Sequence, residues 1–115
     1  MTEQTFRNYL KELTKETRNN ENLRKLLAKN IIPENILNEM RNEMIEVAKQ
    51  GFSGSKVEIE NIISDSYKND LNWINSNARK NLLYDVEMLL KLKFTGINFK
   101  IERKEKTDYI CFWWA

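Results

Sequence analysis

The amino-acid sequence predicts an α+β fold, with a helical first half and a β-hairpin at its C-terminal end. Apolar residues recur at three- and four-residue intervals through most of the chain before Ile97, which is the spacing of a helix face. From Ile97 onward they alternate with polar residues, which is typical of a strand with one solvated face. The chain has 115 residues, of which 41% are hydrophobic and 31% charged. A single domain, residues 1–115, is therefore expected.

The first thirty residues are expected to form two helices. The first, over about 3–17, begins near Thr2, whose hydroxyl can accept an amide hydrogen bond from the first turn. Polar residues at 18–22 interrupt the apolar pattern, so a second helix is expected over about 20–30. Both share a narrow apolar face, made of Phe6, Leu10, Leu13, Leu23 and Leu27. Because such a face needs a partner surface, residues 1–30 are expected to form a semi-independent arm that mediates a symmetric homodimer.

Cap and turn residues divide the middle of the chain. Pro33 suits the first turn of a helix and Gly51 suits the left-handed position after its end, which predicts a helix over about 34–50. Val57 and Ile59 alternate with glutamates, which predicts a short strand over 56–60. The apolar spacing then predicts a helical region over 62–93.

The last part of the chain is predicted to be a hairpin of strands 97–102 and 108–114. The main core is expected to contain Leu89, Leu90, Phe99 and Ile101. The second strand is apolar on both faces, from Tyr109 to Trp114. Such a strand is either covered on both sides or has one side that awaits a partner.

Composition narrows the function classes. The 19 basic and 17 acidic residues give a net charge of +2, which argues against a strong sequence-independent grip on nucleic acid. The chain has no histidine, the commonest general base and metal ligand. Cys111 is the only cysteine and has apolar neighbours, so neither a disulfide nor an activated thiol is indicated. We expect a cytoplasmic protein that is not an enzyme and has no cofactor, no metal site and no membrane segment.

Three motifs suggest a binding or catalytic site, but a connecting loop or a solvated surface explains each of them better. The glycine-containing loop at 51–56 differs in spacing and orientation from a phosphate-binding loop. A nuclease site would need converging carboxylates, and Glu58 and Glu60 alternate with apolar residues as a solvated strand face does. A helix-turn-helix over 23–44 would place glutamates against phosphate, so a solvated face is favoured there. The residues that such a motif would offer to a major groove are Asn35, Asn38, Arg41 and Asn42.

The C-terminal hairpin is the most suggestive surface. Trp113 and Trp114 should point to opposite faces of a regular strand, so that one enters the core while the other is exposed or docked. The candidate partner-binding residues are Trp113, Trp114, Tyr109, Arg103, Lys104 and Lys106. The leading hypothesis is a non-enzymatic protein-binding module. The alternative is a small nucleic-acid-binding protein that uses the basic hairpin, with stacking on aromatic rings and contacts to phosphate.

The order of these features resembles a class of short bacteriophage-encoded accessory proteins. In that class a helix ends in a small residue and a glycine, a strand follows, and a later helix leads into a hairpin that ends in tyrosine and tryptophan. The resemblance covers about residues 35–114 and is carried by Ala48, Gly51, Val57, Ile59, Leu89 or Leu90, Phe94, Gly96, Phe99, Ile101, Tyr109, Ile110 and Trp113. It implies a non-structural phage protein in the host cytoplasm that inhibits a host or defence protein, with no catalytic residues.

Overall fold

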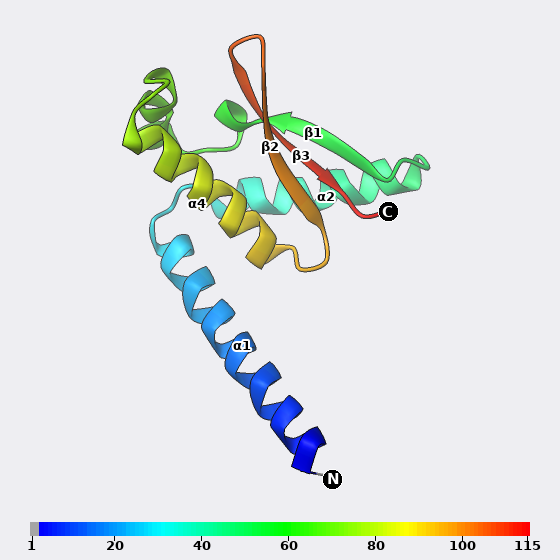
Figure 1. The fold of residues 1–115 in the computed structure, drawn as a ribbon. Coiled ribbons are helices and arrows are strands. Elements are labelled where there is room, and N and C mark those ends of the chain that lie inside the picture. Colours follow the sequence, from blue (N-terminus) through cyan, green and yellow to red (C-terminus); the bar gives the residue numbers. More distant parts are fainter. Residues whose placement is uncertain (1–2) are drawn as a thin grey trace.

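The computed structural model describes residues 3–115, with side chains from Thr5 onward, so the expected cap at Thr2 lies outside the described residues. The fold is α+β, and a three-stranded antiparallel sheet packs on one face against α2 and α4 (Figure 1). The elements in chain order are α1 Glu3–Ala28, α2 Glu34–Lys49, β1 Gly54–Glu58, η1 Ile59–Asn61, α3 Asp65–Lys68, η2 Asn69–Asn72, α4 Asn77–Lys93, β2 Asn98–Lys104 and β3 Thr107–Trp113.

Helix α1 is continuous, so the prediction of two helices over 3–17 and 20–30 was wrong. Asn19 and Asn20 lie within the helix, both exposed to solvent. An exposed asparagine lowers helix stability by only about 0.7 kcal/mol relative to alanine, which is too little to end a helix of this length. Most of α1 extends away from the other elements (Figure 1).

The end of α1 is fixed to the body by polar contacts. Asn30 takes the left-handed conformation after the helix, with φ of 51°. The Tyr67 hydroxyl donates to the Lys29 carbonyl at 2.6 Å, and the Ser64 hydroxyl donates to the Asn30 carbonyl at 2.6 Å. The Lys29 ammonium also donates to Asp85 of α4 at 2.8 Å. These contacts join the end of α1 and the residues that follow it to α4 and to the segment after β1.

Helix α2 ends as its sequence predicts. Gly51 has φ of 88°, its amide donates to the Ala48 carbonyl at 3.0 Å, and the Phe52 amide donates to the Val47 carbonyl at 3.1 Å. This is the Schellman arrangement that a glycine after a helix favours. The buried face of α2 contains Leu37, Met40, Met44 and Val47.

Strand β3 is the central strand of the sheet, with β1 and β2 antiparallel on either side of it. Its two apolar faces therefore belong to an internal strand. A two-residue turn at Glu105 and Lys106 joins β2 to β3, and both residues have positive φ, 51° and 70°. The geometry is that of a type I′ hairpin turn, which usually contains Asn-Gly or Gly-Gly.

One core cluster joins the sheet to α2, α4 and the segment after β1. Leu89 and Leu90 are fully buried and Phe99 is 4% exposed, as the sequence predicted, whereas Ile101 packs against the cluster only partly buried. Within the predicted helical region 62–93, the described chain forms α3, η2 and α4 instead of one long helix. Ser76 begins α4 by accepting a hydrogen bond from the Arg79 amide at 3.1 Å.

Candidate partner-binding surfaces

Among residues 3–115, the helices that contact the sheet pack against one face, and we call the other face the open sheet face. In β3 it carries Tyr109, Cys111 and Trp113, because alternate residues of a strand share a face. The register places Lys56 and Lys100 on either side of Cys111, and Glu58 and Glu102 on either side of Tyr109. The centre of this face is therefore a line of two aromatic side chains and one thiol. A lysine lies on each side of the thiol, and a glutamate lies on each side of the tyrosine.

The two tryptophans lie on opposite faces, as expected. Trp113 is 38% exposed on the open sheet face. Trp114 is partly buried on the core side and stacks on Phe112, with ring centroids 6.4 Å apart. Tyr109 lies under the Lys56 ammonium, which is 4.7 Å from its ring centroid. The structure therefore brings Trp113 and Tyr109 together on one surface and places Trp114 away from it.

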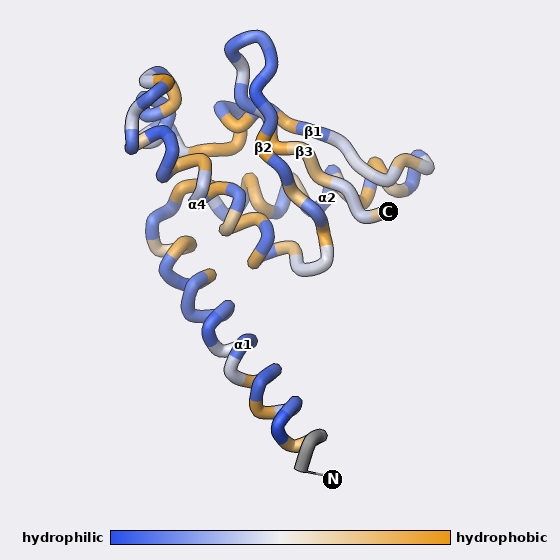
Figure 2. The backbone as a smooth tube through the Cα atoms, in the orientation of Figure 1, coloured by the Kyte–Doolittle hydropathy of each residue, from blue (hydrophilic) through white to orange (hydrophobic). Residues whose placement is uncertain are grey.

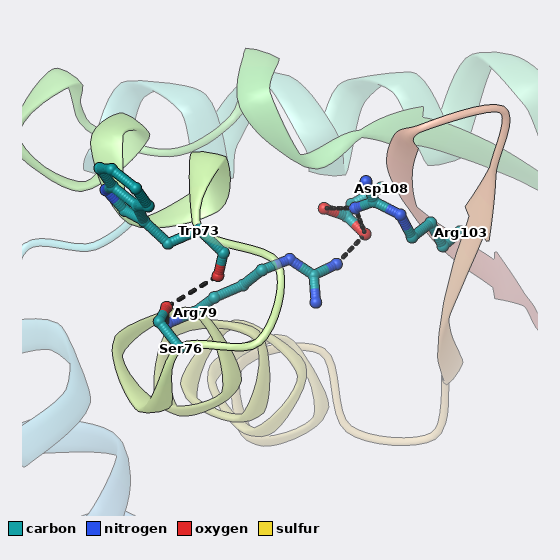
Figure 3. A network of polar contacts seen from close by, with 5 residues as sticks. All are labelled: Trp73, Ser76, Arg79, Arg103 and Asp108. Atoms are coloured by element: carbon teal, nitrogen blue, oxygen red, sulfur yellow. Dashed lines mark hydrogen bonds and ion pairs between the residues drawn. The ribbon is translucent and has the colours of Figure 1, made fainter.

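Arg103 forms part of a buried ion cluster at the hairpin end of the sheet (Figure 3). Its guanidinium contacts both oxygens of Asp108 at 3.2 Å, and Arg79 from α4 contacts the same carboxylate at 2.5 Å. The Asp108 side chain is only 5% exposed and that of Arg79 is 11% exposed. Sequence reasoning missed Asp108 and Arg79. The one signal was an aspartate at the start of an apolar strand, a place where a buried charge needs a partner.

Lys104 and Lys106 lie at the exposed hairpin end, so they do not join Trp113 at the opposite end of β3. Between the lysines and Trp113, Glu58 and Glu102 flank Tyr109. A strand of nucleic acid laid along this face would bring its phosphates near those carboxylates. Two lysines and two glutamates thus alternate along this face, so the basic residues of the hairpin do not form one continuous basic surface with it.

Cys111 lies between Lys56 and Lys100 on the open sheet face. Its thiol donates to a Glu102 carboxylate oxygen at 3.4 Å. Burial raises the pKa of the thiol, and the neighbouring Glu102 raises it further, while Lys56 and Lys100 oppose the shift. A raised pKa leaves little thiolate at neutral pH, and the thiolate is the nucleophile. The site therefore offers poor conditions for a catalytic cysteine.

A second surface lies on α1, where every residue from Thr5 to Asn22 is exposed. At about 100° per residue, Phe6, Leu10, Leu13 and Thr17 fall within roughly 60° of one another. Tyr9 borders them, and we call these five residues the arm stripe. The side chains of Phe6, Tyr9, Leu10 and Leu13 are 44–55% exposed. Figure 2 shows α1 as a mainly hydrophilic helix with short orange, hydrophobic segments along it.

The arm stripe differs from the face by which α1 contacts the body. Leu23 and Leu26, which pack in or against the core, lie roughly 110–170° around the helix from the centre of the stripe. The single apolar face predicted from Phe6 to Leu27 is thus two faces, of which one is covered. Leu27 lies on the uncovered side and is 39% exposed.

The remaining motifs have ordinary structural roles, or their residues do not come together in a catalytic or metal-binding arrangement. The loop at 51–56 links α2 to β1. Strand β1 ends at Glu58, so Glu60 lies in η1 and does not share a strand face with it. No group of three cysteine, aspartate or glutamate side chains within residues 3–115 is placed to hold a metal ion. Over the same residues, no helix is both long enough and apolar enough to cross a membrane.

Compared with protein-family models, curated proteins and solved structures, the chain shows no match.

Proposed function

We propose that this protein is a non-enzymatic protein-binding module whose binding element is the arm stripe of α1. The observation that carries the proposal is that every residue of α1 from Thr5 to Asn22 is exposed, although Phe6, Leu10 and Leu13 form an apolar stripe there. Helices in proteins gain most of their stability from packing of an amphipathic face, and contiguous apolar surface on a protein marks an interaction site. The stripe has the spacing of an amphipathic helix that docks in an apolar groove of a partner.

Two kinds of partner fit this chemistry. The first is a second copy of the chain, which would form the symmetric dimer expected from the sequence. The other is a different protein with an apolar groove, and the resemblance to phage accessory proteins implies a host or defence protein. Mass by light scattering at tens of micromolar distinguishes them, because only self-association doubles the mass of the purified protein.

The test replaces Leu10 and Leu13 together with aspartate. Both side chains are exposed, so the thermal melt should hardly change, while binding should fall at least tenfold because two charges enter the apolar contact. A matched control, Asn8→Asp with Asn19→Asp, adds the same charge to the other side of the helix. Binding is read by site-specific photo-crosslinking from position 9 in cells that express the protein.

Two results would overturn the proposal. One is a monomeric protein that gives no crosslink from position 9 beyond that from Lys15, which is on the opposite side of α1. The other is equal loss of crosslinking in the stripe variant and the matched control, which would show that net charge, rather than the apolar stripe, decides the contact.

A further inference from the structure

A groove between α2 and β1 is distinct from both surfaces described above. Its volume is about 300 Å³. Ile36 and Met40 of α2 form one apolar wall, Val57 of β1 and Ile62 form the other, and the Phe112 ring from β3 reaches into it. Glu39 and Glu43 of α2 stand at its rim, both exposed. The groove is therefore apolar inside and acidic at its mouth.

The same groove runs beside a free strand edge. Strand β1 pairs only with β3 and is an edge of the sheet. The Trp114 amide donates to the Ser53 carbonyl at 3.0 Å, so by antiparallel alternation Ser55 and Val57 share their ladder bonds with β3. The backbone N–H and C=O of Lys56 then point toward the free edge. An extended peptide could pair with these groups and place alternate side chains in the groove.

Charge identifies the kind of peptide. Within residues 3–115, neither Glu39 nor Glu43 has an ion-pair partner, and the two lie four positions apart on one helix face, where like charges repel. Lys56, the one basic residue that lines the groove, directs its ammonium to the Tyr109 ring. The rim is thus complementary to a lysine or arginine supplied from outside.

We propose that the α2–β1 groove binds an extended peptide segment with alternating apolar side chains and a lysine or arginine, added to β1 as a fourth strand. The apolar side chains enter between Met40 and Val57, and the basic side chain meets Glu39 and Glu43. This site is independent of the arm stripe and does not require it.

The test selects peptides from a phage-displayed random twelve-residue library on the purified full-length protein. We expect enrichment of sequences that alternate apolar residues with lysine or arginine. A synthetic copy of the most enriched peptide should bind at least tenfold more weakly to the variant with Glu39→Lys and Glu43→Lys. The matched control is Glu46→Lys with Glu34→Lys, which makes the same charge change on α2 with residues that do not line the groove.

Backbone pairing is tested separately. A copy of the selected peptide with alternate backbone nitrogens methylated cannot form one set of strand hydrogen bonds, and it should lose at least tenfold in affinity when the methylated set faces β1. The proposal is overturned if no sequence family is enriched over resin without protein, or if the Glu39/Glu43 variant binds the selected peptide as the control does. Enrichment that is abolished by Leu10→Asp with Leu13→Asp would assign the peptide to the arm stripe and would also overturn it.

Discussion

At the scale of single residues, the hairpin turn is built from unfavourable residue types. Glu105 and Lys106 both have positive φ, a conformation that costs a non-glycine residue roughly 1 kcal/mol. We expect replacement of the pair by Asn-Gly to raise the free energy of unfolding by about 1 kcal/mol, because these residues adopt the turn with less strain. Urea melts measure the change. An unchanged midpoint would mean that the turn is relaxed as it stands.

A close approach fixes the identity of Gly54. A Cβ at this position would lie 2.6 Å from the Phe112 carbonyl oxygen and 2.9 Å from the Trp113 Cβ, both too near to accommodate without a shift of the backbone. We expect Gly54→Ala to destabilise the protein by about 1–3 kcal/mol, the usual cost of overpacking. Gly51→Ala is the useful comparison, since only its positive φ opposes the change and no atom lies in the way. Thermal melts of the two variants separate steric from conformational cost.

The thiol of Cys111 should react slowly. Its pKa is raised by burial first and then by Glu102, so the thiolate fraction at pH 7–8 is below that of an ordinary cysteine. We expect Glu102→Gln to lower the pKa and to speed alkylation by iodoacetamide at fixed pH, and the rate-against-pH curve should shift to lower pH. Slower alkylation in this variant would contradict the assigned cause.

At the scale of elements, the Asp108 cluster joins the start of α4 to the β2–β3 hairpin (Figure 3). Removal of one partner from a buried ion pair leaves uncompensated charge. We therefore expect Asp108→Ala to cost about 3–5 kcal/mol of folding stability. Asp65→Ala, which removes an exposed pair with Lys68, should leave stability almost unchanged, because solvent screens such a pair. Equal effects in denaturant melts would show that the Asp108 cluster is not stabilising.

The helix ends and core residues that could be predicted from the sequence are those that depend on neighbouring residues in the chain. Gly51 ends α2 through its own backbone preference, and the core residues Leu89, Leu90 and Phe99 follow from periodicity alone. The break expected near Asn19 does not occur, since weak propensities add up to less than the cooperativity of a long helix. Strand order and the Arg79–Asp108 contact join residues distant in the chain, and periodicity carries no information about such pairs. The apolar spacing of the arm stripe is visible in the sequence. That Leu23 belongs to a different, buried face is not visible there, because this face is covered by contact with α4.

At the scale of the whole molecule, α1 makes the protein elongated. The Cα radius of gyration is 16.5 Å, compared with about 13 Å for a compact chain of this length. Because Thr5 to Asn22 bury little surface, deletion of residues 1–20 should leave the rest folded with little loss of stability. Denaturant melts and small-angle scattering would check both points. Loss of cooperative unfolding would show that the arm is part of the core.

The central place of β3 also dictates an order of assembly. Its pairing with β2 needs only the two-residue turn, and hairpins of this kind close in microseconds. Its pairing with β1 joins Glu58 to Tyr109, so a long stretch of chain must first be brought together at an entropic cost. We therefore expect the hairpin to form first and β1 to dock on it later. A chain in which β1 has not yet docked would leave that side of β3 open to strands of other molecules, so we expect incompletely folded chains to aggregate more readily than the native protein.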